Sequence, residues 1–93
     1  MSIKHVDGTN NKNYVFLYAL STCPWCKKVK LLLNEMKVQY DYLDVDLVAG
    51  QEREKALEEL ARYNEKGGFP VLVINKEKVI AGYKPEAIKE ILQ

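Results

Sequence analysis

The sequence contains little of what several common classes of protein require. Its 93 residues include only two cysteines and one histidine, and 14 Lys and Arg nearly balance 13 Asp and Glu, for a formal net charge of +1. This balance argues against nucleic acid as the main partner, because phosphate binding needs a basic excess on one face. The longest uninterrupted apolar run covers only residues 14–20, whereas a membrane-spanning helix needs about twenty residues.

The scarcity of cysteine and histidine also limits disulfide scaffolds and metal sites. Small secreted proteins held by disulfides use more cysteines, spread more widely. A closed zinc site needs four ligands, and Cys23, Cys26 and His5 supply at most three. The polar N-terminal segment contains no apolar signal region, so we expect a cytoplasmic protein that does not bind membranes. With 47% hydrophobic and 29% charged residues, the chain fits one folded globular domain.

The pattern along the chain predicts an α/β fold with the order βαβαββα. Residues 1–13 are polar and rich in turn signals, so we expect a tail or an irregular strand there, followed by a domain over residues 14–93. The first βαβ unit should be a parallel crossover and the last two strands an antiparallel hairpin, which makes a four-stranded mixed sheet flanked by helices. The predicted strands cover residues 14–20, 38–45, 70–74 and 79–81, and the predicted helices cover 24–36, 51–64 and the residues from 85 onward.

Helical spacing also predicts which residues of each helix are buried. The expected inward residues are Val29, Leu32, Leu33 and Met36 in the first helix, Leu57, Leu60, Ala61 and Asn64 in the second, and Ala87, Ile88, Ile91 and Leu92 in the last.

Both cysteines lie in one motif, Cys23-Pro24-Trp25-Cys26, where the first predicted strand meets the first helix. Residues three apart on a helix share a face, at a separation that a disulfide can span. Cys23 would lie at the helix N-terminus, where unpaired N–H groups and the positive end of the dipole stabilise a thiolate. We therefore expect Cys23 to attack a substrate disulfide, and the more shielded Cys26 to resolve the mixed disulfide.

The neighbours of the two cysteines complete the expected active-site turn. Thr22 precedes the motif, Pro24 stiffens the first helical turn, and Trp25 should lie exposed beside the sulfurs as a contact surface. The same motif has two other interpretations, namely half of a metal site shared between chains, or two packing cysteines. The redox interpretation is favoured because the motif follows a strand and opens a helix.

On these motifs, the sequence resembles the glutaredoxin branch of the thioredoxin superfamily over about residues 14–93. Cys23-Pro24-Trp25-Cys26 resembles the glutaredoxin CPYC centre, and Phe69-Pro70-Val71 resembles the stretch that carries a cis-proline. The segment Gly82-Tyr83-Lys84-Pro85-Glu86 resembles a stretch of the NrdH-redoxins. Those proteins are glutaredoxin-like in sequence but thioredoxin-like in behaviour, and they donate electrons to ribonucleotide reductase.

The resemblance implies a thioredoxin/glutaredoxin fold and a small dithiol–disulfide oxidoreductase. It implies substrate binding by Phe69 and Pro70, with the cis-proline turning the Phe69 backbone towards Cys23. Gly82 and Tyr83 are further candidates for substrate binding, and the alternative for Tyr83 is a cover on the last helix. It implies no metal and no tightly bound cofactor, the redox-active group being the Cys23–Cys26 disulfide. The expected partners of this monomer are a disulfide-containing protein, for which ribonucleotide reductase is a candidate, and a thioredoxin-type reductase.

A glutathione-dependent glutaredoxin is the alternative within this class. Glutathione-using members carry a Lys before the first Cys, a Thr-Val-Pro stretch and a Gly-Gly-Asp pattern. The corresponding stretches here are Ala19-Leu20-Ser21-Thr22, Gly68-Phe69-Pro70 and Gly82-Tyr83-Lys84. Without those charge-assisted contacts the affinity for glutathione should drop, unless Lys66 or Lys84 replaces them. Two alternatives from other classes are an iron–sulfur or metal carrier that uses Cys23 in a dimer, and an interaction module without turnover.

Overall fold

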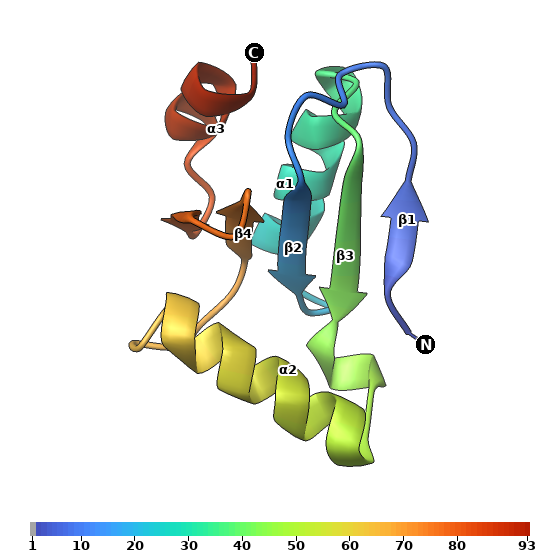
Figure 1. The fold of residues 1–93 in the computed structure, drawn as a ribbon, viewed down its shortest axis with the longest axis vertical. Helices are drawn as coiled ribbons and strands as arrows, with labels where there is room; N and C mark the ends of the chain where they lie inside the picture. Colours follow the sequence, from blue (N-terminus) through green and yellow to red (C-terminus); the bar gives the residue numbers. More distant parts are fainter. Residues whose placement is uncertain (1) are drawn as a thin grey trace.

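The computed structural model describes residues 2–93 and has an α/β fold, with a mixed sheet between helices (Figure 1). The strands follow the order β1-β3-β2-β4-β5, with β2 parallel to β3 and every other neighbouring pair antiparallel. The parallel crossover and the terminal hairpin are both as predicted. In chain order the elements are β1 (Lys4–Val6), β2 (Val15–Ala19), α1 (Pro24–Glu35), β3 (Tyr40–Asp44), the 3₁₀ helix η1 (Val45–Leu47), α2 (Gly50–Tyr63), β4 (Val71–Ile74), β5 (Lys78–Ala81) and α3 (Pro85–Leu92).

The sheet has five strands rather than the predicted four, because β1 pairs with the edge of β3. His5 lies opposite Asp41 in this pair, and Asn10 forms a further bridge with Val38. The sequence predicts either a tail or an irregular strand for residues 1–13. An edge strand of three largely exposed residues needs no apolar periodicity, so the sequence pattern could not decide between the two. The other boundaries lie within two residues of the predicted ones, and η1 was not predicted.

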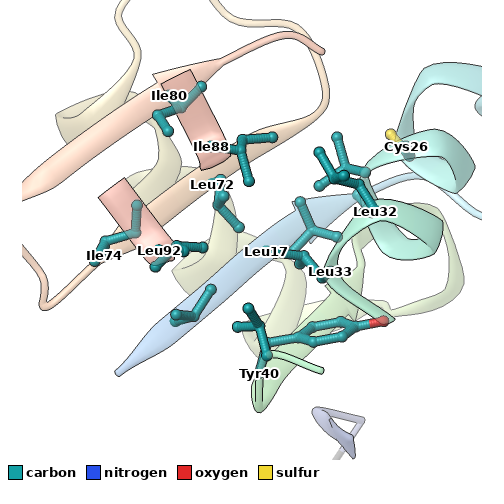
Figure 2. Close-up of a cluster of buried hydrophobic side chains, with 14 residues drawn as sticks. Leu17, Cys26, Leu32, Leu33, Tyr40, Leu72, Ile74, Ile80, Ile88 and Leu92 are labelled. Carbon is teal, nitrogen blue, oxygen red and sulfur yellow. The ribbon is translucent and has the colours of Figure 1, made fainter. Parts of the chain in front are cut away.

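Two apolar clusters, one on each face of the sheet, form the core. Helices α1 and α3 cover one face, where Leu17, Leu33 and Ile88 are fully buried (Figure 2). Helix α2 covers the other face and adds Leu60 to a cluster that includes Tyr18. Because successive residues of the central strand β2 point to opposite faces, both faces require apolar side chains. This explains the continuous apolar run at residues 14–20.

The buried faces of α1 and α3 follow the predicted spacing, but that of α2 does not. In α2, Ala56 and Leu60 are buried, whereas Leu57 is 43% exposed and Ala61 is exposed. The predictions for Leu57 and Ala61 were therefore wrong. The helix has few apolar residues, and Ala56 with Leu60 has the same i, i+4 spacing as Leu57 with Ala61. Spacing alone therefore does not distinguish the two pairs, and packing against the sheet selects the first. Across residues 2–93, none of the helices combines the length and the apolarity that crossing a bilayer requires.

Candidate active site

Cys23 lies at the N-cap of α1, where the chain leaves the end of β2. Its backbone is extended, with φ −84° and ψ 117°, and Pro24 starts the helix without needing a hydrogen-bond acceptor. The Cys23 Sγ accepts a hydrogen bond from the Cys26 N–H at 3.2 Å. A Ser or Asp oxygen usually occupies this capping position. The partly exposed Cys23 sulfur therefore takes the capping position at the positive end of the helix dipole.

Cys26 lies one turn into α1, is fully buried, and forms one end of the core cluster (Figure 2). Both cysteines are free thiols in the structure. Burial raises the pKa of the Cys26 thiol to about 12, and its hydrogen bond with Cys23 acts in the same direction, while the Leu20 backbone and the Lys30 charge oppose the rise. At neutral pH Cys26 is therefore protonated, in keeping with the shielded second thiol that the motif predicts.

Asp46, in η1, holds the turn that leads into Cys23. Within this turn the Cys23 N–H donates to the Leu20 carbonyl at 3.2 Å, and Thr22 is exposed. Ser21 donates two hydrogen bonds to the Asp46 carboxylate, from its N–H at 2.8 Å and from its hydroxyl at 2.5 Å. These bonds lower the pKa of Asp46. The sequence carries no signal for this contact, because it joins two segments 25 residues apart.

A hollow of about 290 Å³ lies beside the cysteine motif. The Phe69–Pro70 peptide bond is cis, as the resemblance implies. The Gly82 N–H donates to the Pro70 carbonyl at 2.8 Å, whereas within residues 2–93 neither the N–H nor the carbonyl of Phe69 has a hydrogen-bond partner. The structure thus gathers, around one opening, Trp25 and all four residues for which substrate binding is expected. The lining residues are Trp25, Phe69, Pro70, Gly82 and Tyr83.

Trp25 and Tyr83 stack on each other along one side of this hollow. Their ring centroids are 5.8 Å apart and the rings are inclined by 27°. Trp25 is 54% exposed, as expected for a contact surface. Tyr83 also packs against the core cluster, so one edge of the pair is anchored. The stack joins α1 to the segment between β5 and α3.

A charged pair lies further along α1. The Lys30 Nζ is 3.2 Å from the Asp44 carboxylate and 4.1 Å from the centre of the Tyr42 ring. The Lys30 side chain is only 21% exposed, although its position in a lysine-rich stretch suggests a solvated residue. Of the residues that the structure describes, no three His, Cys, Asp or Glu side chains lie close enough together to hold a metal ion.

The glutaredoxin family model matches residues 15–79, which is more than half of the chain. The chain belongs to the glutaredoxin family. A glutaredoxin-like 8.6 kDa protein in the rubredoxin operon of Clostridium pasteurianum is 32% identical over 77 residues, covering 83% of this chain and 95% of that protein. The residues that the motif and the fold place at one opening are therefore those of a glutaredoxin-like redox protein.

Solved structures support the same assignment. The glutaredoxin of Methanosarcina mazei Go1 superposes with a TM-score of 0.90 at 44% identity, covering 99% of this chain and 88% of that chain. The methanoredoxin of Methanosarcina acetivorans superposes with a TM-score of 0.85 at 39% identity, covering 88% and 86% respectively. The NrdH-redoxin of Escherichia coli shares the fold, with a TM-score of 0.68 at 20% identity over 84% of this glutaredoxin and 93% of that protein.

Proposed function

We propose that this glutaredoxin is a dithiol–disulfide oxidoreductase that reduces disulfides in proteins through Cys23 and Cys26. One observation carries the proposal. The partly exposed Cys23 sulfur lies at the N-cap of α1, 3.2 Å from the Cys26 N–H, and the protonated Cys26 is buried one turn behind it. A nucleophile that is accessible and a second thiol that is shielded from competing reactions are what a two-step exchange requires.

The exchange transfers two electrons from the protein to its substrate. The Cys23 thiolate attacks one sulfur of the substrate disulfide, forming a Cys23–substrate disulfide and releasing the other substrate sulfur, which takes up a proton. Cys26 then loses its proton and attacks the Cys23 sulfur. The Cys23–Cys26 disulfide forms, the second substrate thiol leaves, and no tightly bound cofactor takes part. A disulfide reductase then returns two electrons, together with one proton for Cys26, and restores the Cys23 thiolate.

The groups around Cys23 have positioning and binding roles in this proposal. The N–H and carbonyl of Phe69, which have no hydrogen-bond partner among residues 2–93, offer an extended substrate segment two backbone hydrogen bonds. Pro70, Gly82 and Tyr83 line the hollow that receives the substrate side chain next to its cysteine. Thr22 and Pro24 shape the turn on either side of Cys23.

Reduction of insulin disulfides with dithiothreitol as electron source tests the proposal. The wild-type protein should accelerate precipitation of the insulin B chain, and Cys23→Ser should abolish the acceleration. In a separate reaction without dithiothreitol, reduced Cys26→Ser should accumulate a mixed disulfide with insulin, visible by intact mass. If the wild-type protein does not accelerate the reaction, the proposal is overturned and the interaction module without turnover is favoured. Full activity of Cys23→Ser would also overturn it, because Cys23 would then not be the nucleophile.

We further propose that a thioredoxin-type reductase, rather than glutathione, reduces this protein, as in the NrdH-redoxins. Two contacts support this choice. The N–H and the hydroxyl of Ser21, in the stretch before the first Cys, are already bonded to Asp46. Tyr83, which stands where the glutathione-using pattern has its second Gly, stacks on Trp25. The oxidised protein should regain its thiols quickly with NADPH and a thioredoxin reductase. Rapid recovery with glutathione and glutathione reductase alone would contradict this choice. An absorbing cluster after anaerobic purification would instead support the metal-carrier alternative.

A further inference from the structure

Lys28 extends the aromatic pair beside the active site. Its Nζ lies 4.6 Å from the centre of the Trp25 ring and 5.9 Å from the centre of the Tyr83 ring. Trp25, Tyr83 and Lys28 together are called the recognition wall below. Cation–π contact with both rings holds the flexible lysine over the stack, so a positive charge lies at a defined place beside the hollow.

Two residues of the recognition wall, Trp25 and Lys28, are exposed and available to a binding partner. More than half of the Trp25 surface is exposed, which is unusual for so large an apolar side chain. Lys28 is exposed, and no carboxylate of residues 2–93 lies within 4 Å of its ammonium. By contrast, Lys30 on the same helix is paired with Asp44. An apolar surface and an unpaired cation beside a reactive sulfur together define what a complementary partner must carry.

The composition of the hollow distinguishes a protein segment from glutathione. Its lining consists of four apolar or aromatic side chains and one glycine. The charged Lys28 contacts two of the lining rings, those of Trp25 and Tyr83. Glutathione carries two carboxylates and an ammonium group, and this lining offers the ammonium no carboxylate. A segment with an apolar side chain next to its cysteine, and one carboxylate beyond it, matches both parts of the surface.

We propose that the recognition wall selects disulfide-bearing protein segments that carry an apolar residue next to the reacting cysteine and an acidic residue beyond it. The apolar side chain packs in the hollow against Trp25 and Tyr83, and the carboxylate pairs with Lys28. This proposal rests on the proposed disulfide reduction and names the class of substrate for the same site. In it, Lys28 is a specificity residue that takes no part in the exchange of sulfur.

An internal competition tests the charge preference. The Cys26→Ser protein, which retains the mixed disulfide, is offered equal amounts of two short peptide disulfides that differ only in Glu or Lys two residues from a Leu-Cys pair. Intact mass after acid quenching gives the ratio of the two mixed disulfides. Because both peptides react with the same Cys23, its nucleophilicity does not affect this ratio. Dithiothreitol reacting with the same peptides supplies the intrinsic ratio.

We expect the acidic peptide to be preferred about three- to fivefold over the intrinsic ratio, as for one exposed ion pair. Lys28→Glu should reverse the preference. The matched control Lys27→Glu changes the net charge equally but removes no cation–π contact, and should leave the ratio within about twofold. When Ser replaces Leu in both peptides, the total amount of mixed disulfide should fall. In the Tyr83→Ala variant, the Leu and Ser peptides should be captured in equal amounts.

Two results would overturn the inference while leaving the proposed function intact. In the first, the Cys26→Ser protein captures both peptides at the intrinsic ratio, whether it carries Lys28 or the substitution Lys28→Glu. In the second, glutathione disulfide added as a third competitor displaces both peptides, which would assign the surface to glutathione. If no disulfide of any kind is captured and insulin is not reduced, the proposed function itself fails.

Discussion

Ser21 donates both of its hydrogen bonds to Asp46, at 2.8 Å from the backbone N–H and 2.5 Å from the hydroxyl. Ser21 lies two residues before Cys23, inside the turn that the Cys23 N–H closes on the Leu20 carbonyl. Asp46 comes from η1, directly after β3. The position of the nucleophile is thus set partly by a segment that is distant in the chain.

Replacing Asp46 should slow disulfide reduction. In Asp46→Ala the turn loses two acceptors, so Cys23 samples more positions, and we expect a rate of insulin reduction lower by roughly three- to tenfold. Leu47→Ala, at an exposed neighbouring position of η1, is the control and should keep the wild-type rate. Because the pKa of Asp46 is lowered from 3.8, the wild-type turn should persist from neutral pH down to about pH 4 and loosen below it. Equal rates for Asp46→Ala and Leu47→Ala would show that the contact does not position Cys23.

The two cysteines should differ in alkylation. Burial raises the pKa of Cys26 to about 12, so at pH 8 reduced native protein should take up one equivalent of iodoacetamide, at Cys23. In denaturant both residues should react. Peptide mapping after digestion identifies the modified residue, and early labelling of Cys26 in native protein would contradict the described geometry.

Pairing of β1 with the sheet should weaken at alkaline pH. The imidazole of His5 contacts Asp41 at 2.6 Å and Asp7 at 2.8 Å, and these bonds raise its pKa above 6.5. A raised pKa in the folded state means that the stabilisation is complete below about pH 6.5 and is lost as the pH rises through the folded value. Amide exchange in β1 should therefore be faster, after correction for intrinsic rates, at pH 8.5 than at pH 5.5.

The substitution His5→Gln supplies the control for this pH effect. A neutral side chain does not titrate, so the corrected exchange of β1 should be the same at both pH values. Corrected protection in the wild-type protein that does not change with pH would show that the two carboxylate contacts do not hold β1.

Gly8 should be intolerant of any side chain. A Cβ there would lie 2.6 Å from the backbone N of Gln39 and would also press on the Lys37 carbonyl. The chain approaches this closely because Asn10 exchanges backbone hydrogen bonds with Lys37 and Gln39, each at 2.9 Å. Gly8→Ala should therefore reduce the free energy of unfolding by about 1–3 kcal/mol, measured by urea denaturation. Thr9→Ala, at an exposed neighbour, should be nearly neutral, and equal stability of both variants would contradict the close packing.

Short-range patterns were sufficient for much of this fold. The apolar run in β2, the spacing of Val29, Leu32 and Leu33, and the Pro24 start of α1 each act within one strand or a few helical turns. Periodicity therefore predicted the order and type of these elements. It left β1 undecided between a tail and an irregular strand, because that strand pairs through backbone groups at the edge of the sheet. It failed for the buried side of α2, where two sets of residues fit the same spacing.

For the candidate site, the spacing of Cys23 and Cys26 at a strand-to-helix junction already implied exchange chemistry, because sulfur separation and helix N–H groups are local properties of three consecutive peptide units. Tertiary packing decided which residues lie around the two sulfurs. It alone placed Asp46 on Ser21, Tyr83 on Trp25, and the Phe69 peptide groups at an open edge. Such contacts join distant segments whose approach depends on how the whole sheet and its helices pack, and no short stretch of residues encodes that.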